Sequence, residues 1–241
     1  LLAWIAYAEL HPDGPVRCDG FDAKGQPVGR PVRDPYIPLV AYTREQSDEL
    51  AYGALLTICQ EGPGANLFDA GLTRIMRKGG AGKAESLASS PNARDGARTT
   101  FQGLDETHRM VLPAQRAAHQ TMLANTAKLF DTWTMETTTA PEPGGGSVAE
   151  ATMDYARQVV SGKVKDSALF FFHRQASDTH DLNTEEGALA AVIEARGPHV
   201  AWSNIDAIVG LWRDPTTDRA YWERVWLNRV VAGSTRAFDA V

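Results

Sequence analysis

The sequence predicts an α/β fold in which helices flank a largely parallel sheet. Two β-favouring runs, 99–104 and 132–138, are separated by good helix formers over 114–129. A strand, a helix of ten or more residues and a second strand form the crossover pattern of a parallel sheet. The 241 residues, of which 43% are hydrophobic and 22% charged, are sufficient to bury a substantial core around such a sheet.

The first sixty residues predict a helix, a loop and a strand–helix pair. Residues 1–10 are apolar on every side and have no capping residue before them, which indicates a helix that has already begun. Gly, Pro and Asp recur over 16–36 and predict a loop or a small hairpin at the sheet edge. The apolar run 37–42 fits a buried strand, and Thr43 then caps a helix from 44 to about 59.

The next segment contains a glycine-rich turn that superficially resembles a phosphate-binding loop. Such a loop requires Gly, four residues, Gly-Lys and then Ser or Thr, between a strand and a helix. Arg77 stands where the first glycine is needed, and Ala84 follows Lys83 where a hydroxyl is needed. We therefore expect an ordinary hairpin, with strands at 72–77 and 85–89 and the glycines in its turn.

The remaining pattern continues the sheet and then becomes helical. The glycine-rich run 141–146 predicts a flexible loop, and a capping box opens a helix over 147–160. The fully apolar run 168–172 predicts a third parallel strand. We therefore expect a sheet-containing core over 1–182 and a helical region over 183–241.

Two adjacent carboxylates follow the first of the two predicted parallel strands. Asp105 and Glu106 thus stand at the carboxyl end of a strand, where open α/β sheets bind their ligands. Asp105 is suited to Mg²⁺, which takes one or two carboxylates plus substrate phosphates, and Glu106 to activation of a water as a general base. Thr137, Thr138 and Thr139 end the neighbouring strand and bring hydroxyls near a bound phosphate. These features predict nucleotide hydrolysis, although an Asp-Glu pair also occurs in surface turns and Thr also favours strands.

Several further side chains have both a functional and an ordinary interpretation. His108 completes the spelling Asp-Glu-x-His, and it is equally typical of a helix cap or a core histidine. Arg94 or Arg98, before the acidic strand, is a candidate phosphate-sensing arginine, although loop arginines are common. Arg77 and Lys78 lie in a basic hairpin that either contacts DNA or is a solvated surface.

Composition limits the classes of partner. The net charge is −6 and the pI is about 5.5, so any contact with DNA requires a local basic patch. The two cysteines, Cys18 and Cys59, are too few for a disulfide framework and suit a reducing cytoplasm. No apolar run approaches the length of a membrane span, so we expect no membrane partner.

Several segments together resemble one known protein family. In order along the chain they are 42–46, 89–96, 100–108, 136–138, 143–144, 146–150 and 212–229. In these segments the sequence is similar to the large subunit of the terminase of tailed bacteriophages, the motor that drives double-stranded DNA into a procapsid. The resemblance is spread over most of the chain, and the ordered set is more specific than any single segment.

The resemblance implies a P-loop-NTPase-like parallel sheet flanked by helices, with an inserted hairpin and a helical C-terminal linker region. It implies ATP as substrate, Asp105 on the side of Mg²⁺, Glu106 as the catalytic glutamate and Thr137, Thr138 and Thr139 as the coupling segment. The implied partners are double-stranded DNA, the portal protein and the small terminase subunit, with a homo-oligomeric ring as the intact assembly. The implied location is the host cytoplasm, with transient docking on the procapsid.

The sequence departs from the family pattern at both ends. The phosphate loop would lie just before Leu1 and the nuclease acids after Val241, so we expect the 241 residues alone to bind ATP weakly and to hydrolyse essentially none. On this interpretation 1–182 are the ATPase core, and 183–241 are a linker leading to an absent nuclease domain. Two alternatives stay open: a helicase-like DExH ATPase, indicated by the Asp-Glu-Thr-His spelling, and a non-enzymatic α/β binding module.

Overall fold

The computed structural model describes residues 1–88 and 96–233. Contacts divide the chain into two compact units, Leu1–Thr138 and Thr139–Val241, and each unit has its own apolar core. This boundary separates two units that pack separately. The predicted boundary between 182 and 183 separates an ATPase core from a linker region, and it stays a prediction. Within the described residues, no helix is long and apolar enough to cross a membrane.

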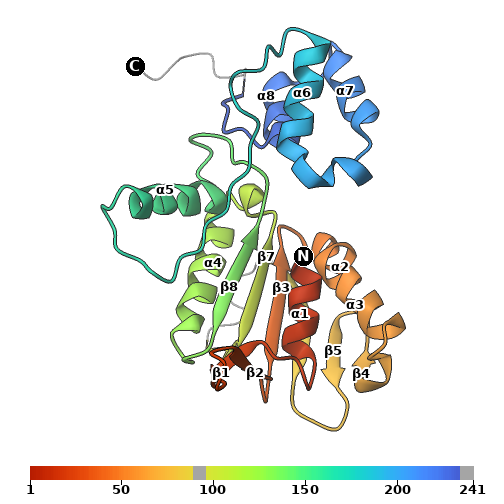
Figure 1. Ribbon diagram of the computed structural model, residues 1–241, viewed down its shortest axis with the longest axis vertical. Coiled ribbons are helices and arrows are strands. Elements are labelled where there is room, and N and C mark those ends of the chain that lie inside the picture. Colours follow the sequence, from red (N-terminus) through yellow and green to blue (C-terminus); the bar gives the residue numbers. More distant parts are fainter. Residues whose placement is uncertain (89–95, 234–241) are drawn as a thin grey trace. The chain divides into compact units, whose positions relative to one another are not determined.

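A six-stranded sheet forms the centre of the first unit (Figure 1). Its strand order is β4-β5-β6-β3-β7-β8, in which β6, β3, β7 and β8 are parallel and the pairs β4–β5 and β5–β6 are antiparallel. The glycine-rich turn joins β5 to β6, in agreement with the predicted hairpin. The strands are β3 (Tyr36–Ala41), β4 (Phe68–Ala70), β5 (Arg74–Arg77), β6 (Lys83–Ala88), β7 (Phe101–Asp105) and β8 (Trp133–Thr137).

Helices cover both faces of this sheet. They are α1 (Leu2–Leu10), α2 (Arg44–Glu49), α3 (Ala51–Glu61) and α4 (Pro113–Thr126). The apolar side chains of α1 and α3 pack in one cluster with Ile37, Leu39 and Phe101 of the sheet. On the other face, the buried amide of Gln102 donates through Nε2 to the carbonyl oxygen of Met122 in α4 at 2.9 Å. Consecutive β7 side chains therefore serve opposite faces, as the period of two requires.

Gly103 allows α1 to approach β7 closely. A Cβ atom at this position would lie 2.7 Å from Leu39 Cδ2 and 3.3 Å from Leu2 Cδ2. Because Leu2 is the first residue of α1, the helix begins beside Gly103, in the middle of β7. The amino end of α1 thus points towards the sheet edge where β7 and β8 end (Figure 1).

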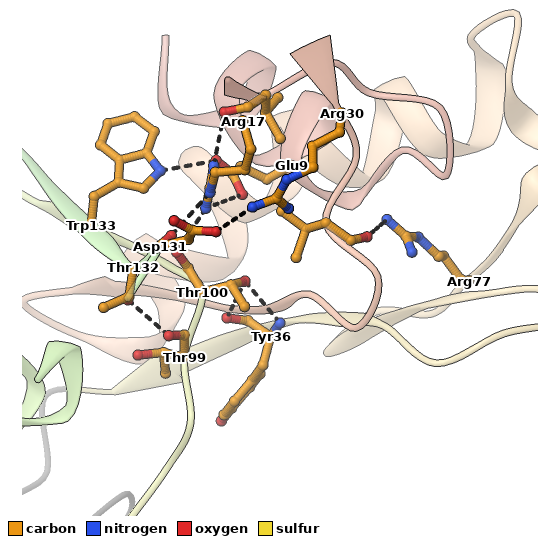
Figure 2. A network of polar contacts seen from close by, with 12 residues as sticks. Glu9, Arg17, Arg30, Tyr36, Arg77, Thr99, Thr100, Asp131, Thr132 and Trp133 are labelled. Carbon is orange, nitrogen blue, oxygen red and sulfur yellow. Dashed lines mark hydrogen bonds and ion pairs between the residues drawn. The ribbon is translucent and has the colours of Figure 1, made fainter. Parts of the chain in front are cut away.

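A buried polar network ties α1 to the starts of β7 and β8 (Figure 2). Glu9, which is 1% exposed, accepts hydrogen bonds from Arg17 Nη1 and Nη2 at 2.5 and 3.0 Å and from Trp133 Nε1 at 2.9 Å. Arg17 also donates to the carbonyl oxygens of Thr100 and Asp131 at 3.1 and 3.0 Å. Both charges are therefore paired and hydrogen-bonded, as a buried ion pair requires.

Two predictions for the first sixty residues need correction. The hairpin within 16–36 consists of β1 (Arg17–Phe21) and β2 (Pro27–Arg30), which form a separate two-stranded sheet and not an edge of the main one. The single helix expected over 44–59 is divided at Leu50, whose φ of −98° and ψ of −96° lie outside the helical region. The change of direction lets α3 pack beside α1 in the common core.

The second unit is helical apart from its connecting segments. Its helices are α5 (Val148–Val160), α6 (Glu185–Arg196), α7 (Ile205–Arg213) and α8 (Arg219–Trp222). Trp222 is buried in a cluster with side chains of α6 and α7, and its Nε1 donates to the carbonyl oxygen of Ile208 at 3.0 Å. Ser147 caps α5 by accepting the N–H of Glu150 at 3.2 Å, as the capping box predicts.

The predicted loop over 141–146 is present in this unit, whereas the predicted strand over 168–172 is absent. The loop 141–146 is held around the carboxylate of Glu150, which accepts the backbone N–H of Gly144 and, at 2.7 Å, that of Gly146. The apolar run 168–172 is irregular and not a strand. No strand of the described residues pairs with this run, so it belongs to no ladder.

Removing one partner of the Glu9–Arg17 pair should destabilise the chain strongly. Arg17→Ala leaves the Glu9 carboxylate buried without its counter-charge, so we expect the free energy of unfolding to fall by about 3–5 kcal/mol. The matched control is Arg30→Ala, because Arg30 is 39% exposed and pairs with Asp131 at 2.5 Å. Its loss should be about 1 kcal/mol or less. Urea denaturation followed by circular dichroism measures both, and equal losses would contradict a special role for the buried pair.

Candidate functional site

The carboxyl ends of β7 and β8 place an acid and a hydroxyl side by side. Asp105, the last residue of β7, is the register partner of Thr137, the last residue of β8. The Thr137 hydroxyl donates a hydrogen bond to Asp105 Oδ1 at 2.7 Å. The two strand ends therefore meet as the sequence predicts, at the edge where open α/β sheets bind ligands.

The adjacent Glu106 leaves the strand through a left-handed backbone conformation. Its φ of 57° and ψ of 40° are uncommon for a residue other than glycine. Its N–H is shared between the Thr137 carbonyl oxygen at 2.8 Å and Asp105 Oδ1 at 3.1 Å, which holds the turn. Such strained residues cluster at active sites, where the surrounding structure maintains them.

Burial changes the chemistry of the Glu106 carboxyl group. Desolvation raises its pKa above the ordinary value, the negative charge of Asp105 raises it further, and the positive charge of Arg109 opposes both. The Arg109 Nε atom lies 3.8 Å from Glu106 Oε2. A carboxylate with a raised pKa is a stronger base than a solvated one, which suits proton abstraction from water.

His108 contacts two of the predicted site residues. Its backbone N–H donates to Thr138 Oγ1 at 3.0 Å, and its ring Nδ1 lies 3.0 Å from the same oxygen. The ring Nδ1 is also 3.5 Å from Glu106 Oε2. The Asp-Glu-x-His pattern alone does not show what His108 contacts. Its partner Thr138 lies thirty residues further along the chain, so the structure is needed to identify the contact.

The three predicted coupling threonines occupy different positions. Thr137 bonds Asp105, and Thr138 bonds His108. Thr139 follows the end of β8 and belongs to the second unit. The structure therefore brings the Thr137 hydroxyl to Asp105 and the Thr138 hydroxyl to His108, and the coupling role of all three stays a prediction.

The residues at this edge fit the chemistry of Mg²⁺. Within the described residues, the hydrogen bonds to the Asp105 carboxylate fall on Oδ1, which leaves Oδ2 to a ligand. No cluster of three or more His, Cys, Asp or Glu side chains in that part of the chain forms an all-protein metal site. Mg²⁺ usually binds through one or two carboxylates, several waters and substrate phosphates. One carboxylate at the ligand edge is sufficient for that mode.

The basic hairpin contains one structural arginine and one exposed lysine. Arg77 donates to four backbone carbonyl oxygens at 2.6–3.1 Å, including those of Leu10 and His11 at the end of α1. It therefore caps that helix, and its partial burial lowers the pKa of the guanidinium. Lys78 is exposed in the turn. Of the two predicted DNA contacts, Arg77 is therefore engaged in holding the fold, and Lys78 is the one whose side chain is exposed.

The predicted phosphate-sensing arginine is not at the acids in the part of the chain that the structure describes. Arg94 lies outside the described residues. Arg98 is exposed in the irregular segment before β7. Since β7 starts at Phe101 and ends at Asp105, Arg98 stands at the amino end of the strand, away from the carboxylates.

An ion pair that the sequence pattern does not reveal lies behind this edge. His119 Nε2 of α4 is 2.7 Å from Glu136 Oε1 of β8. Glu136 immediately precedes Thr137, so its side chain serves the opposite face of the sheet. The pair holds the end of β8 against α4, and no local signal marks two residues from separate segments as partners.

Two phage proteins are similar to this chain, one in sequence and one in fold. The Gene 13 protein of Mycobacterium phage L5 is 27% identical over 180 residues, which cover 70% of this chain and 29% of that protein. The crystal structure of the HK97 bacteriophage large terminase matches with a TM-score of 0.67 at 15% identity, over 95% of this chain and 43% of that one. No family model matches the sequence. The chain thus shares its fold with a phage large terminase and spans less than half the length of either protein.

The raised pKa of Glu106 has a consequence for stability. A carboxyl group whose pKa is higher in the folded state destabilises that state once it ionises, and has no such effect at a pH low enough to protonate it in both states. Glu106→Gln removes the charge. We therefore expect a higher thermal midpoint than the parent protein at about pH 8, and a gain that disappears towards about pH 4. Calorimetry at both pH values measures the difference, and a gain independent of pH would contradict the burial effect.

Proposed function

We propose that this chain is the ATPase motor portion of a phage terminase large subunit, which couples ATP hydrolysis to packaging of double-stranded DNA into a procapsid. The observation that carries the proposal is the pairing of Asp105 with Thr137 beside a half-buried, left-handed Glu106. The carboxyl edge of a parallel sheet is the expected position of a nucleotide phosphate. The fold shared with a phage large terminase supports the same conclusion.

Each residue at this edge has a defined part in the proposed hydrolysis. Glu106 accepts a proton from a water whose oxygen attacks the γ-phosphorus, and ADP leaves in line with the bonding electron pair. Asp105 would hold Mg²⁺, which when bound neutralises charge on the phosphates. Thr137 orients the Asp105 carboxylate through its hydrogen bond. The positive charge of Arg109 opposes the rise in the pKa of Glu106, which favours the carboxylate form that accepts the proton.

The sheet limits where a phosphate loop would join. Such a loop connects a strand to the helix that follows it, and the amino end of α1 points towards the ligand edge. The parallel strands follow one another in the order β6, β3, β7 and β8, and β6 is paired with β5 on its other side. Among the described strands, β8 is therefore the parallel strand with one side unpaired. The proposal therefore puts the strand of the phosphate loop beside β8, with the loop facing Asp105 and Thr137.

The proposal also includes partners and a location, which rest on the resemblance. The partners are double-stranded DNA, the portal protein and the small terminase subunit, and a homo-oligomeric ring is the intact assembly. The location is the host cytoplasm, with transient docking on a procapsid. Because the net charge is −6, contact with DNA would depend on local basic side chains such as Lys78.

The role of Glu106 is tested in the full-length protein. Glu106→Gln should lower the rate of ATP hydrolysis by roughly 10² to 10⁴, because the amide cannot accept the proton of the attacking water. Nucleotide affinity should be preserved, since the amide keeps the shape of the carboxylate. Phosphate release and nucleotide titration measure the two effects. The control is Glu61→Gln at the exposed end of α3, and near-normal turnover in Glu106→Gln would remove the assigned role.

The DNA contact is tested at Lys78. Lys78→Glu should weaken binding of double-stranded DNA and reduce the slope of log affinity against log salt by about 1, because one phosphate contact is lost. Lys24→Glu makes the same charge change in the turn between β1 and β2 and should leave DNA affinity unchanged. Fluorescence anisotropy over a salt series measures both variants. Equal effects would assign the loss to overall charge. Arg77 is unsuitable, since its replacement would uncap α1.

A further inference from the structure

The ring of His108 lies between Thr138, one of the predicted coupling threonines, and Glu106, the proposed base. Nδ1 is 3.0 Å from Thr138 Oγ1, directly beyond the end of β8, and 3.5 Å from Oε2 of the proposed base Glu106. The His108 backbone N–H donates to Thr138 Oγ1, and of the two directions that the ring contact allows we assign the one in which the Thr138 O–H donates to Nδ1. In this arrangement the neutral ring carries its proton on Nε2.

A single ring nitrogen has room for one strong hydrogen bond. While Nδ1 accepts from Thr138, it offers Glu106 no proton, and the Glu106 carboxylate keeps its acceptor sites for a water. If the end of β8 withdraws Thr138, the ring exchanges protons with solvent, losing one at Nε2 and gaining one at Nδ1. Nδ1–H then donates to Glu106 Oε2, which occupies the carboxylate and weakens it as a base.

We propose that His108 is a positioning residue that switches the base Glu106 on or off according to whether Thr138 holds its Nδ1 atom. The inference rests on the proposed function, because it assigns a regulator to the same site. It gives the Asp-Glu-x-His spelling a role distinct from that of a cap or core histidine. It also supplies a physical link between the position of the β8 end and hydrolysis, which passes through one shared atom.

The neighbouring charges do not supply the same link. Arg109 approaches Glu106 Oε2 at 3.8 Å from the exposed side, and it carries its charge whatever the position of β8. Asp105 is bonded to Thr137 and not to the histidine ring. Among the contacts of Glu106, the one with His108 is therefore the contact that depends directly on Thr138.

The proposal predicts that one substitution rescues another. In the full-length protein, Thr138→Ala should lower kcat for ATP hydrolysis about tenfold or more without a matching change in nucleotide affinity, because Nδ1 turns to Glu106. Adding His108→Ala removes that donor and should restore kcat to within about threefold of the parent protein. Steady-state phosphate release, with a nucleotide titration and a thermal midpoint for each variant, measures these effects.

A matched variant separates hydrogen bonding from side-chain volume. His108→Asn brings an amide N–H close to the place of Nδ1, so in the Thr138→Ala background it should fail to rescue, whereas His108→Ala succeeds. The inference is overturned if Thr138→Ala turns over normally, or if the double variant with His108→Ala is as slow as Thr138→Ala alone. If Glu106→Gln loses turnover but His108→Ala does not rescue Thr138→Ala, the inference about His108 is wrong and the proposed base stands. Normal turnover in Glu106→Gln removes the proposed base, and the inference with it.

Discussion

The buried ion pair of Glu9 and Arg17 is the interaction on which the site geometry depends, although it lies at the amino ends of the strands and the site lies at their carboxyl ends. It binds Trp133 Nε1 and the Thr100 carbonyl oxygen, where β8 and β7 begin. A register shift of one residue would move every side chain to the other face. Fixing the starts of two adjacent parallel strands therefore fixes which residues face each other at their ends. The same carboxylate belongs to α1, so the position of that helix is set by the same contacts.

The features of Glu106 at the carboxyl ends of β7 and β8, where the ligand would bind, lower the stability of the folded state. Glu106 has a left-handed backbone and a partly desolvated carboxyl group next to a second acid, and each of these features destabilises the folded state. The bonds from its N–H to Thr137 and Asp105 keep the turn in place. A fully stabilised carboxylate would be a weaker base, so the raised pKa and the strain belong to the same function.

The sequence predicts those features that follow from local pattern or from topology. The parallel sheet follows from two strands around one helix, and the meeting of Asp105 with Thr137 follows because parallel strands end at a common edge. Several of the failed or missing predictions depend on contacts between distant segments. Arg77 reads as a surface cation, yet it caps α1 across sixty-seven residues. His108 meets Thr138 only because β7 and β8 are neighbours, and no spacing rule connects them.

The run 168–172 shows where local pattern stops being sufficient. Its apolar, aromatic composition is more strand-like than that of β8, which carries three polar side chains among five residues. Yet β8 is a strand and 168–172 is not, with Phe170 and Phe172 left 87% and 69% exposed. The difference is pairing, because β8 pairs with β7 over its whole length whereas 168–172 pairs with no described strand. A strand exists through its ladder, so its propensity is realised only beside a partner. The same condition governs the site, whose geometry is a property of the β7–β8 pair and of neither strand alone.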